Sequence, residues 1–462
     1  MKSLLCSTVL FVYFAPLYSR VKYGLHEDKC FCELSGKVED CCCDVEAVNS
    51  LNKEVFKRIT EIVNTNYFKF YKVNLARSCP YWHDDNQCSL KDCSVQTCKE
   101  EEVPEGVKGH YMKDESKDCY VENSTLGDVN IHLSEEDKQV FATWQQYDDA
   151  EDSFCYPEDE LSADSKYVNL LLNPERFTNY KGPSANRVWH SIYNENCFKV
   201  TNPYTDKYQM NSMLNQMCLE KRVFYRVISG MHASINTHLS ALYLFKGNGF
   251  FKPVWAPNAN EFKRRFDPEK TNGQGKTAQN PCMYESVEMK NLHVVKHGPS
   301  WLKNIYFLYL LVWRAIVKAG PYWKQEGFYT GNSTEDELVK KHVEDLLSQA
   351  RSCPSTFDES IMFTGDPIKS KGLKEEFRKK FRNITRIMDC VGCQKCRLWG
   401  KVQTQGIGTA LKILFSRNQL DESTVASTFR LKRNEIVALF NALGRYSSSI
   451  HYVQMFRSLS KT

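Results

Sequence analysis

Cysteine content constrains the fold of this chain more than any other feature of its sequence. Nineteen of the 462 residues are cysteine: Cys6 stands alone near the start, ten lie within residues 30–119, five within 120–389, and three within 390–396. The cytosol keeps such thiols reduced, so a chain this rich in cysteine either binds metal or folds in an oxidising compartment. Other features of the sequence must therefore distinguish metal binding from folding in an oxidising compartment.

The first residues favour the oxidising compartment. Lys2 precedes an apolar stretch over residues 4–17, and Ser19 follows at a plausible cleavage point. That stretch is too short to span a bilayer, so we interpret residues 1–19 as a secretory signal peptide. Three acceptor motifs for N-glycosylation agree with an oxidising lumen. They begin at Asn123, Asn332 and Asn383.

Apolar periodicity predicts a mainly α-helical domain over residues 20–462. Apolar residues recur at steps of three and four within 223–242 and again within 373–388, while alternating strand patterns are scarce. Residues 305–313 are continuously apolar but too few for a membrane span, so they predict a buried helix. No linker divides the chain. Residues 99–166 are expected to be loop with short helices, and 267–300 a surface insertion.

The triplet Cys390, Cys393 and Cys396 is the most informative local pattern. Cysteines three apart can close a small redox disulfide at the start of a helical turn, and the basic side chains within residues 395–401 would favour the thiolate. Static disulfides and a metal or iron–sulfur site remain alternatives. A cluster needs a fourth ligand, and zinc needs a second pair, which does not stand nearby in the sequence.

A second group, Cys88, Cys93 and Cys98, lies in a polar segment that we expect to be exposed and mobile. Local sequence favours an ordinary disulfide knot over a dithiol that meets another protein. The close pairs Cys30–Phe31–Cys32 and 41–43 suggest two nested structural bridges.

Cofactor motifs are weak. Residues Gly406–Ile407–Gly408 form a lone G-x-G that we interpret as a helix start after a loop rather than as a dinucleotide fingerprint. Ser229 and His232 share a face of the predicted central helix, where a lone histidine is more often a core residue than a ligand. Trp189 and Tyr193 also favour a core role. The net charge of +5 is too small to predict nucleic-acid binding.

Several long motifs together resemble the endoplasmic reticulum oxidoreductins, flavin enzymes that oxidise protein disulfide isomerase. Residues 388–401, Met-Asp-Cys-Val-Gly-Cys-Gln-Lys-Cys-Arg-Leu-Trp-Gly-Lys, are similar to the active-site signature of that family. Four other segments are similar as well. They are residues 174–178, 228–235, 302–307 and 403–411. The resemblance extends from about Cys30 to Arg445.

The resemblance implies a single helical domain that holds FAD in a helical bundle, with a disulfide-tied N-terminal segment and long flexible loops. It implies that Cys393 and Cys396 are the inner pair beside the flavin, and that Cys88 and Cys93 are an outer shuttle pair within a loop over about 79–119. The local preference for a static knot is thereby overruled. The implied structural bridges are Cys30–Cys43, Cys32–Cys41, Cys79–Cys390 and Cys197–Cys218. The implied regulatory pairings are Cys93–Cys98 and Cys88–Cys119.

The implied contacts to FAD are Arg176, Thr178, Trp189, Ser229, His232 and Arg265. Trp301 stands where vertebrate relatives have an FAD-binding arginine, and Lys296, His297 or Lys303 would have to supply that cation. The expected activity is oxidation of protein disulfide isomerase and related thioredoxin-fold proteins by molecular oxygen, with hydrogen peroxide as product. The expected location is the lumen of the endoplasmic reticulum, with peripheral membrane contact allowed. A noncatalytic, disulfide-rich luminal binding protein is the alternative.

Overall fold

A computed structural model describes part of the chain. The described residues are 45–83, 88, 93–108, 111–113, 118–120, 154, 164–178, 180–195, 199–201, 208–210, 219–245, 304–350, 359, 362–363, 366–415 and 431–461. Helices dominate them, which confirms the predicted mainly α class.

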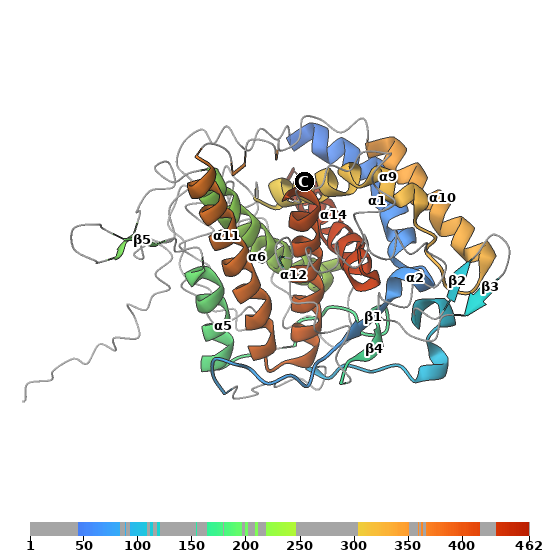
Figure 1. Ribbon diagram of the computed structural model, residues 1–462, viewed down its shortest axis with the longest axis horizontal. Coiled ribbons are helices and arrows are strands. Elements are labelled where there is room, and N and C mark those ends of the chain that lie inside the picture. Colours follow the sequence, from blue (N-terminus) through green and yellow to red (C-terminus); the bar gives the residue numbers. More distant parts are fainter. Residues whose placement is uncertain are drawn as a thin grey trace, which may run out of the picture.

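Helix α14 (Arg433–Lys461) lies at the centre of the fold. It packs against α1 (Val45–Val63), α6 (Leu219–Phe245) and α12 (Gln394–Phe415), as Figure 1 shows for the middle of the molecule. Residues 436–443 of α14 are all buried. A helix that is covered on every side needs no single apolar face, because its neighbours exclude water all around it.

Helix α11 (Pro367–Ile387) carries the chain into the cysteine triplet. Asp366 caps its first turn by accepting a hydrogen bond from the backbone N–H of Lys369 at 2.9 Å. Its buried residues Phe377, Phe381 and Ile384 follow the three- and four-residue steps that predicted a helix here. The packing of α11 against α5 (Pro183–Asn194), α6 and α12 places its C-terminal end beside the start of α12.

The apolar run at 305–313 is a buried helix, as the sequence predicts. Residues 304–318 are helical, and Trp313 is completely buried. Two further helices follow, α9 (Gly320–Gln325) and α10 (Ser333–Ala350). Within the described ranges, no helix combines the length and the apolar character needed to cross a membrane.

Strands are few and short. Three antiparallel pairs occur among the described residues: β1 (Phe70–Val73) with β4 (Lys166–Asn169), β2 (Tyr111–Lys113) with β3 (Asp118–Tyr120), and β5 (Lys199–Thr201) with β6 (Tyr208–Met210). The remaining short elements are α2 (Asn66–Lys69), η4 (Glu100–Glu102) and η5 (Glu105–Lys108). The stretch 99–166, expected to be loop with short helices, thus also contains the strand pair β2–β3 and the first residue of β4.

The expectation that Gly406 and Gly408 begin a helix is wrong. Both lie inside α12, more than two turns from its start. A Cβ atom on Gly406 would lie 2.4 Å from the backbone oxygen of Ala438. The glycine therefore lets α12 approach α14 closely. This packing requirement cannot be predicted from the neighbouring residues in the sequence.

Candidate active site

The inner cysteine pair lies between two helices. The 3₁₀ turn η11 (Met388–Cys390) ends α11, and Cys393 directly precedes α12, so the pair stands at the start of a helix as predicted. A disulfide joins Cys393, which is fully buried, to half-buried Cys396. The hydroxyl of Thr178 lies 3.3 Å from the Cys393 sulfur and 3.2 Å from the Cys396 sulfur. Both inner sulfurs therefore share one polar neighbour.

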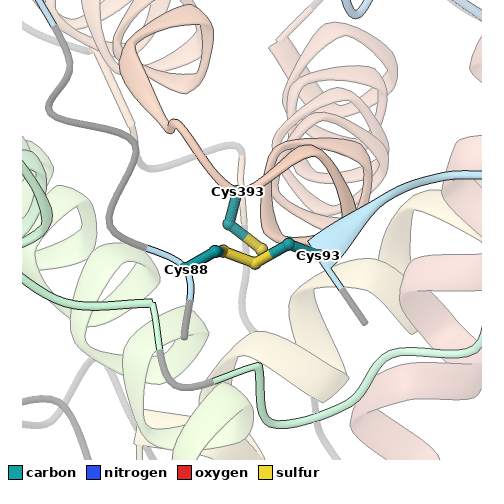
Figure 2. A group of neighbouring side chains, drawn as sticks. All are labelled: Cys88, Cys93 and Cys393. Atoms are coloured by element: carbon teal, nitrogen blue, oxygen red, sulfur yellow. A yellow bond between two sulfur atoms is a disulfide. The ribbon is translucent and has the colours of Figure 1, made fainter. Parts of the chain in front are cut away.

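The outer pair lies directly against the inner pair. A disulfide joins Cys88 to Cys93, and the sulfurs of Cys88, Cys93 and Cys393 all lie within 4.8 Å of one another (Figure 2). Both outer cysteines are half-buried and pack against the core, although the sequence predicts an exposed segment. Contact with the inner pair accounts for this burial. The residues around Cys88 and Cys93 in the sequence do not predict that contact.

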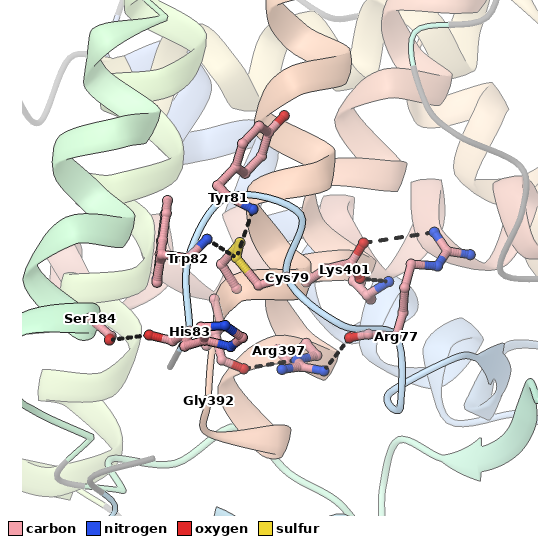
Figure 3. The surroundings of a disulfide bond; sticks show 12 residues. Arg77, Cys79, Tyr81, Trp82, His83, Ser184, Gly392, Arg397 and Lys401 are labelled. Atoms are coloured by element: carbon pink, nitrogen blue, oxygen red, sulfur yellow. Dashed lines mark hydrogen bonds and ion pairs between the residues drawn. A yellow bond between two sulfur atoms is a disulfide. The ribbon is translucent and has the colours of Figure 1, made fainter. Parts of the chain in front are cut away.

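A long-range disulfide fastens the segment before the outer pair to the inner loop. Cys79 is bonded to Cys390 across 311 residues, the pairing that the resemblance implies. Figure 3 shows Arg397 beside this bond. Its guanidinium donates to the backbone oxygens of Val391 at 2.8 Å, Leu75 at 2.6 Å and Arg77 at 3.1 Å. Arg397 thus ties the two chain segments together independently of the disulfide.

A buried ion pair underlies the same region. The Lys401 ammonium lies 2.6 Å from a carboxylate oxygen of Asp389, which is 1% exposed, and Arg77 approaches that carboxylate to 3.8 Å. The sequence suggested that the basic residues within 395–401 favour a thiolate. Lys401 instead faces Asp389, and Arg397 faces backbone carbonyls. Lys395 is better placed to favour a thiolate, because it lines the same cavity as Cys396.

A cavity adjoins the inner pair, because Cys396 forms part of its lining. Its walls are mainly apolar and aromatic. The lining residues are Glu175, Arg176, Tyr180, Ala185, Val188, Trp189, Ile192, Met231, Ile235, Leu239, Met388, Val391, Lys395, Cys396, Trp399 and Gly400. Apolar walls with a few convergent charges are typical of a cofactor site. A planar heteroaromatic group such as a flavin fits that lining beside Cys396.

Aromatic residues close one end of the site. The Trp189 ring stacks on the His232 ring with centroids 3.8 Å apart, and the Tyr193 hydroxyl lies 2.8 Å from Nδ1 of His232. Burial raises the pKa of Tyr193 well above its usual range, so this phenol stays protonated. His232 covers one face of Trp189. An adenine ring would therefore stack on the other face or displace the imidazole.

Beside the cavity lies a buried ion pair that sequence reasoning missed. Arg445 on α14 donates from Nη2 to Oε1 of Glu175 at 2.7 Å, and Nε2 of His238 lies 4.0 Å from the other carboxylate oxygen. Burial lowers the pKa of Arg445 to about 9, which still leaves the guanidinium charged at neutral pH. Glu175 precedes Arg176 in a motif of the resemblance, but nothing in the sequence indicates that α14 pairs with it.

The remaining predicted residues are placed as follows. Ser229 is buried and accepts a hydrogen bond from the Asn304 amide at 2.9 Å. Cys98 is a half-buried free thiol. Asn332 is exposed, whereas the Asn383 amide lies within α11 and donates to Glu195 at 3.3 Å. Cys119 is placed only as part of β3. Outside the described residues lie Cys30, Cys32, Cys41, Cys43, Asn123, Cys197, Cys218, Arg265, Lys296, His297, Trp301, Lys303, the segment 1–19 and the stretch 267–300.

Comparison with known proteins gives consistent similarities. A sequence profile of the family Endoplasmic Reticulum Oxidoreductin 1 (ERO1) matches residues 54–453. ERO1-like protein alpha from Rattus norvegicus is 45% identical over 450 residues, covering 93% of this chain and 92% of that protein. Ero1-like protein from Drosophila melanogaster is 43% identical over 462 residues, covering 93% and 90%. The solved structure of Ero1p, described as a source of disulfide bonds for oxidative protein folding in the cell, matches with a TM-score of 0.57 at 27% identity, covering 90% and 98%.

Proposed function

The chain belongs to the Endoplasmic Reticulum Oxidoreductin 1 family of oxidoreductases, and from that premise we propose that it is a luminal thiol oxidase that makes disulfides in protein disulfide isomerase. The observation that carries the proposal is the contact between two disulfides of unequal exposure. Cys88–Cys93 and Cys393–Cys396 approach within 4.8 Å at the sulfurs of Cys88, Cys93 and Cys393. Thiol–disulfide exchange requires sulfurs at such proximity.

Electrons would pass inward by two exchanges. A thiolate of the reduced isomerase attacks Cys88–Cys93, and its second thiol resolves the mixed disulfide, which leaves the isomerase oxidised and the outer pair as two thiols. An outer thiolate then attacks Cys393–Cys396, which re-forms the outer disulfide and leaves the inner pair reduced. Each exchange moves two electrons and two protons, so the sulfur chemistry balances.

Bound FAD would supply the two-electron oxidation of the inner dithiol, with molecular oxygen as the final acceptor and hydrogen peroxide as the product. Arg176 and Lys395 line the cavity beside Cys396 and would face the anionic parts of the cofactor, while Trp189 and Trp399 offer flat apolar surfaces. Full burial of Cys393 keeps folded proteins away from the inner pair. This explains why an outer pair is needed to meet a protein substrate.

The proposed location is the lumen of the endoplasmic reticulum, reached through a signal peptide over residues 1–19. The proposed partners are protein disulfide isomerase and other thioredoxin-fold proteins. We propose that the protein is retained there through a bound isomerase or a peripheral membrane contact. Secretion of the protein from cells in which isomerase binding is intact would contradict retention by the isomerase.

The test compares variants of the two pairs. Cys393→Ser should abolish oxygen uptake with isomerase and with small dithiols, because both routes end at the inner pair. Cys88→Ser should abolish oxidation of isomerase and leave part of the activity on small dithiols, which can reach the inner pair directly. Full isomerase oxidation by the Cys88 variant would refute the outer-pair assignment.

Colour separates the proposal from a noncatalytic binding protein. Purified oxidase should be yellow from bound flavin, whereas a protein held together by disulfides alone is colourless. Loss of the yellow cofactor on Trp189→Ala would support placement of the adenine on that ring, since stacking on an aromatic face contributes about 1–3 kcal/mol. A full complement of flavin in that variant would contradict the placement.

A further inference from the structure

The two disulfides that meet at the site also bring together four potential thiolate ligands. We propose that the fully reduced protein binds one zinc ion through Cys88, Cys93, Cys393 and Cys396. Binding does not depend on the proposed oxidase activity; only its effect on turnover rests on that activity.

The geometry needs side-chain adjustment to hold a metal. The sulfurs of Cys88, Cys93 and Cys393 lie within 4.8 Å of one another, and Figure 2 shows all three pointing to one place. Zinc–sulfur bonds of about 2.3 Å in a tetrahedron set the sulfurs roughly 3.8 Å apart, so the two sulfurs of each pair have to separate once their disulfide is reduced, while Cys393 already lies within reach of the outer pair. The Cys396 sulfur is bonded to that of Cys393 and would have to turn toward the outer pair to supply the fourth corner once that bond is reduced.

The spacing of both pairs is that of structural zinc sites. Cys88 and Cys93 have four residues between them, and Cys393 and Cys396 have two. Structural sites commonly take two ligands from each of two such short spacings. The sequence argued against zinc because no second pair stands near the triplet. The fold removes that objection by placing the distant pair against it.

The surroundings suit an anionic zinc–thiolate centre. Four thiolates around one Zn²⁺ carry a net charge of minus two, and Lys395 and Arg176 line the cavity that Cys396 also borders. The Thr178 hydroxyl, within 3.3 Å of both inner sulfurs, can donate to a coordinated thiolate. Such outer contacts hold ligands in place and typically contribute 10–100-fold to metal affinity.

Binding requires prior reduction but no redox change at the metal. Each disulfide takes up two electrons and two protons: a dithiol supplies both and becomes a disulfide, whereas a phosphine supplies the electrons and becomes a phosphine oxide, with the oxygen and the protons coming from water. Zinc then displaces the four thiol protons and forms four Zn–S bonds. While these bonds hold, no thiolate is available for exchange, so the metal would arrest the enzyme in its reduced state.

The decisive measurement is zinc X-ray absorption on the full-length protein, reduced under nitrogen with a phosphine that is then removed. The chain has 19 cysteines, and any of them offers a zinc ligand once it is reduced, so the result is read as a difference between variants. The double variant Cys88→Ser with Cys93→Ser should lose one equivalent of zinc, together with a component of four sulfurs at about 2.3 Å. Cys98→Ser is the matched control, because Cys98 is a nearby free cysteine outside the cluster.

Equal zinc content in the double variant and the unaltered protein would overturn the site. So would an equal loss in the Cys98→Ser control. The effect on turnover is measured separately: zinc added during oxygen uptake should stop it, and a chelator should restore it. Uninterrupted uptake with zinc bound at four sulfurs would refute the arrest. Absence of oxygen uptake without zinc would refute the proposed oxidase and leave the absorption result standing.

Discussion

At the scale of single residues, Thr178 is placed to control the reactivity of the inner pair. Its side chain is buried, and its hydroxyl contacts both sulfurs. Donation to a thiolate stabilises the charged form and lowers the pKa of the thiol. Thr178→Val keeps the shape and removes the donor, so the inner thiol pKa should rise and alkylation of the reduced pair should need a higher pH. Mass spectrometry of alkylated peptides across a pH series measures the shift.

Thr178→Ser is the control for that experiment, since serine keeps the hydroxyl and loses only a methyl group. The pH dependence of alkylation in this variant should match that of the unaltered protein. A valine variant with an unshifted profile would show that the hydroxyl has no influence on the thiols.

The surroundings of Cys98 should slow the regulatory exchange with Cys93 that the family resemblance implies. Burial, and secondarily the charge of Glu102, raises the pKa of its thiol. The thiolate is the attacking species, so at neutral pH less of it is available than in an ordinary cysteine, and its share grows as the pH rises toward the raised pKa. Pairing of Cys98 with Cys93 should therefore be slow near neutral pH and faster in mild base.

Glu102→Gln tests this electrostatic account, because the amide can still accept the hydrogen bond from the backbone N–H of Lys99. Removal of the charge should lower the pKa of Cys98 and speed its alkylation at neutral pH. The same alkylation rate in both proteins would leave burial as the sole cause.

At the scale of elements, the Arg397 side chain joins α12 to the segment that leads to the outer pair. Hydrogen bonds from a charged group to buried acceptors contribute about 1.5–3 kcal/mol each. Arg397→Lys keeps the charge but loses the fork that reaches three carbonyls, so it should lower the free energy of unfolding and slow transfer from the outer to the inner pair. Denaturant unfolding and stopped-flow oxidation of isomerase measure the two effects.

Arg378→Lys on α11 is the matched control. Arg378 makes a two-point contact with Glu375 three residues earlier, but the Glu375 side chain is 57% exposed, so water can replace a weakened contact. It should leave stability and transfer nearly unchanged. If Arg397→Lys behaves like this control, the Cys79–Cys390 disulfide alone holds the two segments together.

Elements differ in how far the sequence predicts them. The periodic apolar residues of α6 and α11 and the buried run at 305–313 predict helices because each pattern is local. Sequence spacing cannot reveal the Cys79–Cys390 bond or the β1–β4 pair, since their partners are far apart along the chain. The pairing of Cys79 was available only from resemblance, and the Glu175–Arg445 contact from neither source.

At the scale of the whole molecule, the site is assembled from segments that meet only because the helices pack closely. The outer pair lies in a loop within the first third of the chain. Thr178 and Glu175 lie in the segment before α5, and the inner pair lies at the junction of α11 and α12. Helix α14 packs against α12, α1 and α6, and it supplies Arg445. Any change that moves α12 away from α14 should therefore disturb stability and site together.

Gly406→Ala makes that change with one methyl group. The new Cβ would lie 2.4 Å from the Ala438 oxygen and 2.6 Å from the Ala442 Cβ, so the two helices must separate. Overpacking of this kind costs about 1–3 kcal/mol. Because α12 begins directly after Cys393, the displacement should also slow exchange between the outer and inner pairs. Gly372→Ala on α11 is the matched control: its Cβ would meet nothing within 4 Å, and alanine at this exposed position should stabilise the helix by roughly 0.5–1 kcal/mol. Equal unfolding free energies for the two alanine variants would mean that close contact between α12 and α14 does not support the site.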